Sequence, residues 1–233
     1  MNGSCRQTIL MNGDSVNETK KQNVVGAEPW NESERQLLDS LTTPEKIQVF
    51  LDSIPYNVEI TCRSPRRVMR DRRAHCFEGS MMAAAALERI GHPPWLVDMG
   101  AVRDDEHVIA VFRKNGGWGA LAKSNCSGLR YRSPVYKSLR ELVMSYFEDY
   151  FNTTAERTLR SFTRPMLLTD ELYRGWRTAE EDLDPIGDLL EARIHVPLLT
   201  QVMESDLAPV DDLTLRAGFL GANPDGLYQP GSS

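Results

Sequence analysis

The chain of 233 residues carries a formal net charge of −6, with 41% hydrophobic and 26% charged residues. These values are typical of an ordinary globular protein with one domain, alone or with an appended subdomain. No apolar run approaches the ~18 residues that span a bilayer, so no membrane partner is expected, and the overall acidity argues against nucleic acid as a partner.

Residues 1–28 are polar and lack periodicity, which predicts a disordered N-terminal segment. They contain no continuous apolar stretch of the secretory type, so a cytoplasmic location is expected. No cysteine belongs to a CxxC pair or has a histidine-rich neighbour of zinc type. The sequence therefore predicts free thiols in a reducing compartment, with no disulfide, metal or cofactor. The cysteines are Cys5, Cys62, Cys76 and Cys126.

Three short helices are predicted ahead of residue 74. The first covers 32–41. Thr43 and Pro44 are typical of an N-cap and a first helical position, and they open the second helix. Ser64 and Pro65 begin the third, which runs towards Arg73. The apolar residues of the second helix recur at helical spacing; they are Ile47, Phe50, Leu51 and Ile54.

Charge is distributed unevenly along the chain. Between positions 63 and 73 there are six arginines and a single acid, Asp71, whereas from Asp170 onward thirteen acids face four arginines. The basic cluster is suited to a phosphate, a carboxylate or an acidic carrier protein. The alternative is that it pairs with the acidic C-terminal region inside the fold. Its members are Arg63, Arg66, Arg67, Arg70, Arg72 and Arg73.

A cysteine stands at the beginning of the strongest helical run, CFEGSMMAAAALER, which Gly91 ends. Cys76 falls in its first turn, where unpaired backbone N–H groups and the helix dipole favour a thiolate. The alternative is that Cys76 is one more small buried residue. Glu78, in the same turn, is expected to support the helix N-terminus rather than to act as an acid.

The pattern changes to strands after Pro93 and Pro94. Strands are expected at 95–102, 108–113 and 118–122, with a hairpin turn at 115–117, and a helix follows at 138–151. The predicted fold class is α+β, with N-terminal helices and the Cys76 helix packed on a small antiparallel sheet. The expected layout is a core at 29–152, an acidic helical extension at 153–217 and a flexible tail at 218–233.

This order of elements resembles the transglutaminase-like cysteine peptidase superfamily. Cys76 opens the helix CFEGSMMAAAALER, His107 opens HVIAVF, and Trp118 opens WGALAKSN. The resemblance covers roughly residues 65–125, a quarter of the chain. It implies a papain/transglutaminase-like fold in which Cys76 is a nucleophile and His107 holds it as a thiolate. The remaining histidines fit less well: His75 adjoins the thiol and would point elsewhere, His92 lies in a Pro-rich turn, and His195 is far along the chain.

The third catalytic group is the weak point of the resemblance. The family implies an acid four residues after Trp118, and the sequence has Ala122 there. Asn125, at the end of the same strand, is the favoured substitute for orienting His107. Ser124, Asp104 and Asp105 are further candidates, and a broken triad is the fourth possibility.

The predicted function is thiol-dependent acyl transfer on a peptide, amide, ester or acyl-thioester, ending in hydrolysis, amide formation or cyclisation. The Cys76 backbone N–H is expected to contribute to an oxyanion hole. Trp95, Trp118 and Arg73 are the candidate substrate-binding residues, although tryptophans are common in cores. The alternative function is a catalytically inactive binding or scaffold protein with the same fold.

Overall fold

The computed structural model describes residues 30–229, so the N-terminal segment predicted to be disordered lies outside the described residues. No helix in the described range has the length and apolar character that a bilayer crossing requires. The helices are α1 (Glu32–Ser40), α2 (Pro44–Ser53), α3 (Pro65–Asp71), α4 (Cys76–Arg89), α5 (Leu139–Met144), α6 (Asp184–Glu191), α7 (Gln201–Ser205) and α8 (Asp212–Gly218), with 3-10 turns η1 (Phe147–Asp149) and η2 (Pro224–Gly226).

A seven-stranded antiparallel sheet forms the middle of the molecule, with the order β4-β3-β2-β1-β5-β7 and β6 beside β1. The mixture of helices and antiparallel sheet predicted from the sequence is confirmed. The strands are β1 (Trp95–Ala101), β2 (His107–Lys114), β3 (Gly117–Leu121), β4 (Arg132–Tyr136), β5 (Leu159–Thr163), β6 (Met166–Leu167) and β7 (His195–Pro197).

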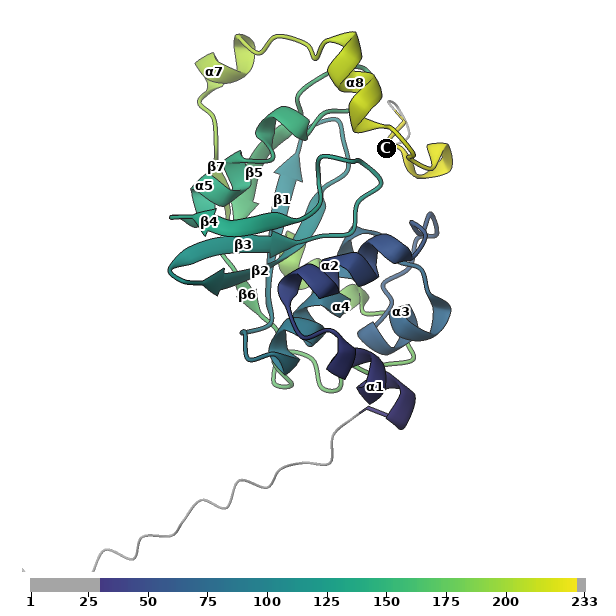
Figure 1. Cartoon of the computed structure of the whole chain (residues 1–233). Coiled ribbons are helices and arrows are strands. Elements are labelled where there is room, and N and C mark those ends of the chain that lie inside the picture. The colour runs from purple at the N-terminus through teal and green to yellow at the C-terminus, as the bar shows by residue number, and fades with distance from the viewer. Residues whose placement is uncertain (1–29, 230–233) are drawn as a thin grey trace, which may run out of the picture.

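The sheet is buried on both faces, which separates the core into two clusters. Successive strand residues alternate between them: Val108 belongs to the cluster beneath α1–α4, and Ile109 to the cluster beneath α5 and η1. Figure 1 shows α2, α3 and α4 gathered on one side of the strands and α5 on the other. Because both faces are apolar, β2 is a continuous hydrophobic run rather than an alternating one.

The predicted helix starts near the site have the expected caps. The side chain of Thr43 accepts a hydrogen bond from the Lys46 N–H, and that of Ser64 accepts one from Arg67 N–H, each with proline at the first helical positions. These caps fix where α2 and α3 begin. Helix α4 then lies against the sheet, where Ser80 Oγ donates to the Val108 carbonyl at 2.7 Å.

Gly79, in the first turn of α4, is explained by a close approach from the chain that continues β3. A Cβ at this position would lie 2.3 Å from Cβ of Lys123. Lys123 is buried, and its Nζ donates to the carbonyls of Leu51 and Ile54 at the end of α2. A glycine is therefore needed where helix propensity alone favours alanine.

Replacing Gly79 by alanine should destabilise the protein by about 1–3 kcal/mol, because the new methyl group collides with an immobile buried side chain. The matched control is Gly187→Ala in α6, where an added Cβ meets nothing within 4 Å. That variant should gain about 0.5–1 kcal/mol from helix propensity. Urea unfolding of both variants checks the prediction, and a stabilised Gly79→Ala protein would contradict it.

Two expected elements differ in the structure. Residues 153–217, expected to be a helical extension, supply β5, β6 and β7 to the sheet, beside three short helices. In β5 the apolar residues Leu159 and Phe162 are buried. The arginine and serine between them interrupt the alternation of apolar and polar residues that predicts a strand. The helix expected at 138–151 is broken at Ser145 into α5 and η1.

Candidate active site

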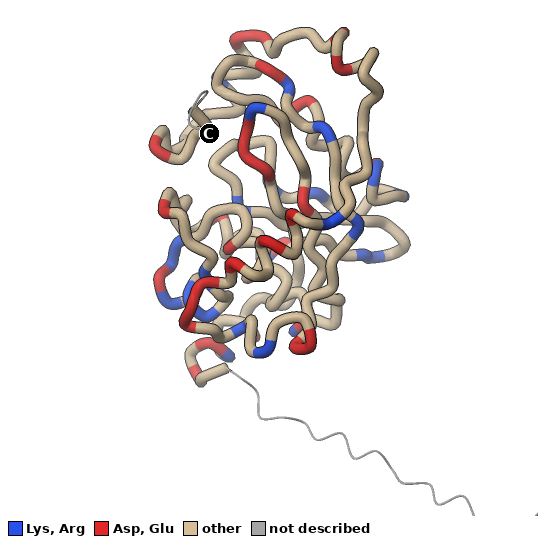
Figure 2. Tube along the Cα trace, turned by 180° about the vertical axis from the view of Figure 1, so that it is seen from behind, with Lys and Arg blue, Asp and Glu red and all other residues tan. Residues whose placement is uncertain are grey.

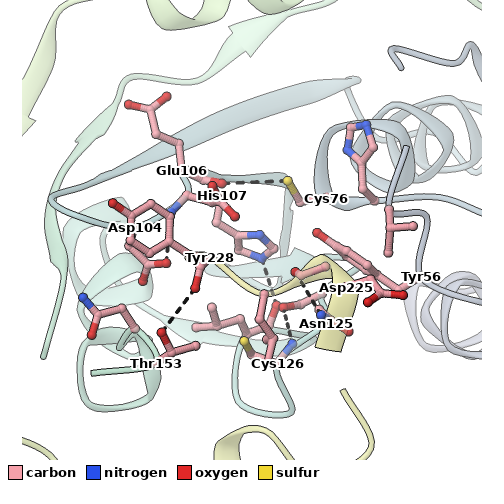
Figure 3. A pocket seen from close by; sticks show the side chains of 18 of the residues that line it. Tyr56, Cys76, Asp104, Glu106, His107, Asn125, Cys126, Thr153, Asp225 and Tyr228 are labelled. Atoms are coloured by element: carbon pink, nitrogen blue, oxygen red, sulfur yellow. Dashed lines mark hydrogen bonds between the residues drawn. The ribbon is translucent and has the colours of Figure 1, made fainter. Parts of the chain in front are cut away.

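Cys76 and His107 lie together at the edge of one cavity of ≈ 610 Å³. Cys76 is the first residue of α4 and His107 the first residue of β2, so the start of a helix and the start of a strand meet there. Figure 3 shows the thiol and the imidazole ring side by side, with Cys76 Sγ 3.8 Å from the main-chain oxygen of Glu106. The sequence predicted this pairing of elements.

The surroundings of Cys76 favour its thiolate. Burial raises the pKa of the thiol, but hydrogen bonding to His107 and His75 and the charges of these two rings outweigh burial. The pKa of Cys76 is therefore held well below its usual value. Its place at the helix N-terminus adds to this effect. The two further cysteines in the described range differ: burial is the main cause that raises the pKa of Cys62 and of Cys126 to about 12 each.

The His107 ring is oriented by a backbone carbonyl. Its Nε2 lies 2.9 Å from the Leu129 oxygen. Because a carbonyl oxygen only accepts, Nε2 carries a hydrogen, and Nδ1 remains to exchange a proton with the thiol. Tyr150 packs edge-on against the ring at 6.4 Å between centroids. The ring is 4% exposed, so its orientation is fixed by packing as well as by the hydrogen bond.

His75, which was expected to point away, lies beside the thiol instead. It is the N-cap residue of α4, so its backbone is extended and its side chain does not follow the helical spiral. Burial lowers the pKa of His75, but the hydrogen bond and charge of Cys76 and the charge of Glu78 raise it to about 9. The expectation failed because it placed His75 inside the helix rather than at its cap.

Glu78 supports the start of α4, as its position in the sequence indicated. The side chain is fully buried, and Oε2 accepts a hydrogen bond from the His75 backbone N–H at 3.1 Å. Oε1 accepts from the backbone N–H and the guanidinium of Arg63, both at 3.1 Å. Thr61 and Asn57 donate the remaining bonds, at 2.7 and 3.1 Å. The carboxylate thus ties the preceding loop to the residue that carries the thiol.

The expected third residue does not orient His107. The Asn125 side chain bonds the main chain of Asn223 and Gly226, and Ser124 Oγ accepts from the Cys126 N–H. The position implied by the family, Ala122, is buried in the hydrophobic cluster under α5. The oxygen beside His107 instead belongs to Leu129, and a main-chain carbonyl has no signature in the sequence.

Asp104 and Asp105, on the loop before His107, line the same cavity. Asp104 accepts from Thr158 Oγ1 at 2.7 Å and from the Asp105 N–H at 3.0 Å. Burial is the main cause that raises the pKa of Asp104 to about 6, and it raises that of Asp105 as well. Neither carboxylate hydrogen-bonds the imidazole among the contacts of the described residues.

The candidate substrate-binding residues lie away from the cavity. Trp95 and Trp118 pack on each other with ring centroids 5.7 Å apart, near the end of the sheet remote from His107. Arg73 pairs with Glu59 at 2.8 Å, and neither it nor the tryptophans are among the described residues lining the cavity. Both tryptophans are partly buried and pack against the hydrophobic cluster beneath α5 and η1.

Five of the six arginines of the cluster form ion pairs with carboxylates among the described residues. Figure 2 shows its blue segments interleaved with red ones in the lower part of the trace. Arg66 pairs with Glu34, Arg67 with Asp182 and Arg70 with Glu180. Arg63 is held by Glu59, Asp71 and Glu78, and Arg72 stacks over the Phe50 ring at 4.9 Å. Two of these partners, Asp182 and Glu180, belong to the acidic C-terminal region, which agrees with the alternative interpretation of the cluster. An acidic partner at this cluster stays a prediction. The cavity itself is lined by no lysine or arginine among the described residues.

Tyr56, which the sequence did not single out, lines the cavity from the loop after α2. Burial raises the pKa of its hydroxyl, with smaller contributions from the charges of Cys76 and Asp105, so the group remains a donor. A single tyrosine in a polar loop carries no signal in a sequence. Within residues 30–229, no three His, Cys, Asp or Glu side chains are arranged to hold a metal ion.

Fold and site together describe an α+β protein with a helix-borne thiol next to an oriented imidazole. No protein-family model and no curated protein matches the chain. Among solved structures, the chain is similar to LapG of Legionella pneumophila in its EGTA-treated form, at 16% identity and a TM-score of 0.37. The match covers 68% of this chain and 84% of LapG. At this level of similarity it assigns neither a family nor an activity.

Proposed function

We propose that the protein is a thiol-dependent acyl-transfer enzyme with a papain/transglutaminase-like core, in which Cys76 is the nucleophile and His107 the general base and acid. The observation that carries the proposal is the Cys76 thiol, whose pKa is held well below its usual value beside an imidazole in a ≈ 610 Å³ cavity. Perturbed titratable groups in a concave site are typical of catalytic centres.

In the proposed acylation step, the thiolate sulfur attacks a carbonyl carbon, and the electron pair of the C=O bond moves onto oxygen. Collapse of the tetrahedral intermediate forms the thioester and breaks the bond to the leaving group. His107, which holds the proton taken from Cys76, gives it to the departing nitrogen, oxygen or sulfur through Nδ1. The Leu129 carbonyl keeps the ring in the tautomer that this transfer requires.

The developing oxyanion needs hydrogen-bond donors. Cys76 is the first residue of α4, so its backbone N–H has no partner within the helix and is available to the oxyanion. The Tyr56 hydroxyl is the second donor that we propose, because it lines the same cavity and stays protonated. This pair would stabilise the intermediate without any cofactor.

Deacylation returns the thiolate. A water molecule or an amine attacks the thioester carbon, His107 accepts its proton, and the C–S bond breaks. Water gives hydrolysis of a peptide, amide, ester or thioester, and an amine gives a new amide or a cyclised product. A reducing compartment such as the cytoplasm suits this chemistry, since Cys62, Cys76 and Cys126 are all free thiols.

The experiment is to incubate the protein with a panel of activated thioesters and peptide amides, quench in acid and map adducts by mass spectrometry. An acyl group on Cys76 that decays faster with added amine or at higher pH supports the proposal. Cys62 and Cys126 are internal controls, with thiol pKa values of about 12. Adducts spread evenly over all cysteines, or none at Cys76, would favour the inactive binding or scaffold protein.

A further inference from the structure

The C-terminal residues form one wall of the candidate active site. Residues 225–229 line the cavity that contains Cys76 and His107. We call residues 218–229 the C-terminal strap. Figure 1 shows it in yellow after α8, and Figure 3 shows Asp225 and Tyr228 within the same close view as Cys76. Within the segment expected to be a flexible tail, residues 218–229 make specific contacts, and residues 230–233 lie outside the described residues.

Asn125 is the main attachment of the strap, and it contacts only the main chain there. Its Oδ1 accepts from the Asn223 N–H at 2.8 Å, and its Nδ2 donates to the carbonyls of Asn223 and Gly226 at 2.8 and 3.0 Å. The side chain is 8% exposed. An amide that makes three such bonds to one turn fixes that turn across the cavity.

Contacts on both sides of the cavity complete the attachment. Thr153 Oγ1 donates to the Tyr228 carbonyl at 3.2 Å. On the opposite side, a Cβ on Gly226 would lie 3.0 Å from the Tyr56 ring, so the strap lies directly against that ring. The strap begins at Gly218, where an added Cβ would lie 2.3 Å from Cζ of the Phe151 ring. The strap thus bridges two walls of the site.

The strap and the helices before it bury little apolar surface beyond Phe219, which is half-buried with its ring 5.6 Å from that of Phe151. None of α7, α8 and η2 contains a buried residue, and Leu213 and Leu220 are 70% and 79% exposed. Segments attached by hydrogen bonds at the surface, with few buried apolar contacts, open at low free-energy cost compared with global unfolding. The strap is therefore suited to local opening while the sheet and α4 remain folded.

We propose that the C-terminal strap is a removable wall of the active site, latched by Asn125 and Thr153, whose opening admits polypeptide substrates to Cys76. The inference rests on the proposed function. With the strap closed, the cavity is of small-molecule size, in the range of about 300–1,000 Å³ typical of ligand pockets. A polypeptide that reacts at a main-chain carbonyl continues on both sides of it, so it needs a longer opening than a cavity walled by residues 225–229 offers. Asn125 acts here as a positioning residue: it holds the strap closed and so limits the size of the substrate that reaches Cys76.

The test compares two thiol reagents on the full chain, small iodoacetamide and a maleimide carrying a 5-kDa polymer, each followed as loss of the unmodified Cys76 peptide. Asn125→Ala removes the three hydrogen bonds between this side chain and the main chain of the strap. The variant should therefore raise the rate with the bulky reagent by about tenfold or more. The rate with iodoacetamide should change by less than about twofold. Thr153→Val, which removes one hydrogen bond, should show the same selectivity to a smaller degree.

The control is Ser127→Ala, which removes a bond to the Ala217 carbonyl just before the strap and leaves the latch intact. It should behave as the wild type with both reagents. Equal changes for both reagents, or no change with the bulky one in either latch variant, would overturn the proposal. A midpoint of Cys76 alkylation at or above about 8.5, the usual thiol pKa, would overturn the proposed catalysis instead. The ratio of the rates with the two reagents would still report whether the strap opens.

Discussion

Replacing His107 by alanine should lower the rate of acyl transfer by about 10²–10⁴-fold, because the proton exchanged with Cys76 loses its carrier. The same variant should raise the pKa of the Cys76 thiol, since the hydrogen bond to His107 is the first of the influences that lower it. His75 stays in place in this variant and continues to lower the pKa of the thiol against the effect of burial. Turnover and pH-dependent alkylation measure the two effects.

The matched control is His92→Ala. His92 packs edge-on against Phe112, with centroids 5.5 Å apart, and is not among the described residues lining the cavity. It should leave both turnover and the alkylation profile of Cys76 unchanged. Unaltered turnover in His107→Ala would show that the imidazole is a packing residue, and the proposed mechanism would fail with it.

Replacing Glu78 by alanine should destabilise the protein by about 3–5 kcal/mol, because it breaks a buried ion pair. Glu78 is 0% exposed, and the Arg63 side chain that pairs with it is 4% exposed. Removing the carboxylate leaves a buried guanidinium with one partner fewer and frees the His75 and Arg63 N–H groups. Urea denaturation measures the change.

Glu148→Ala is the control for that experiment. Glu148 also forms an ion pair with an arginine, Arg157 at 2.9 Å, but its side chain is 73% exposed. Exposed pairs contribute about 0–1 kcal/mol, so this variant should remain close to the wild type. A Glu78→Ala protein as stable as Glu148→Ala would mean that the carboxylate does not hold the start of α4.

The helix and strand that carry Cys76 and His107 were predictable because each begins at a clear local signal. A small-residue helix starts at Cys76, and a β-branched, apolar strand starts at His107. Their meeting follows from short connections around one antiparallel pair, β1 and β2. Local signals were thus sufficient for the two elements, whereas the pairing of Cys76 with His107 was predicted from the resemblance in the order of elements.

The orientation of His107 was not predictable for a physical reason. Every residue has a main-chain carbonyl, so the sequence does not indicate that the carbonyl of Leu129 is the group that orients His107. Asn125 has a side-chain amide, which the sequence does show, and it is therefore the residue predicted for this role. The contact between Asn125 and the strap joins residues about a hundred positions apart and depends on the whole fold. Likewise β5 pairs with β1, which is distant in the sequence, and the mixture of apolar and polar residues in β5 does not predict a strand.

Alkylation of wild-type Cys76 as a function of pH tests the central claim most directly. Because only the thiolate reacts, the iodoacetamide rate at each mapped cysteine follows its ionised fraction. We expect the midpoint for Cys76 well below about 8.5, while Cys62 and Cys126, with pKa values of about 12, stay unreactive through neutral pH. A midpoint for Cys76 at or above about 8.5 would contradict an activated thiolate and with it the proposed enzyme.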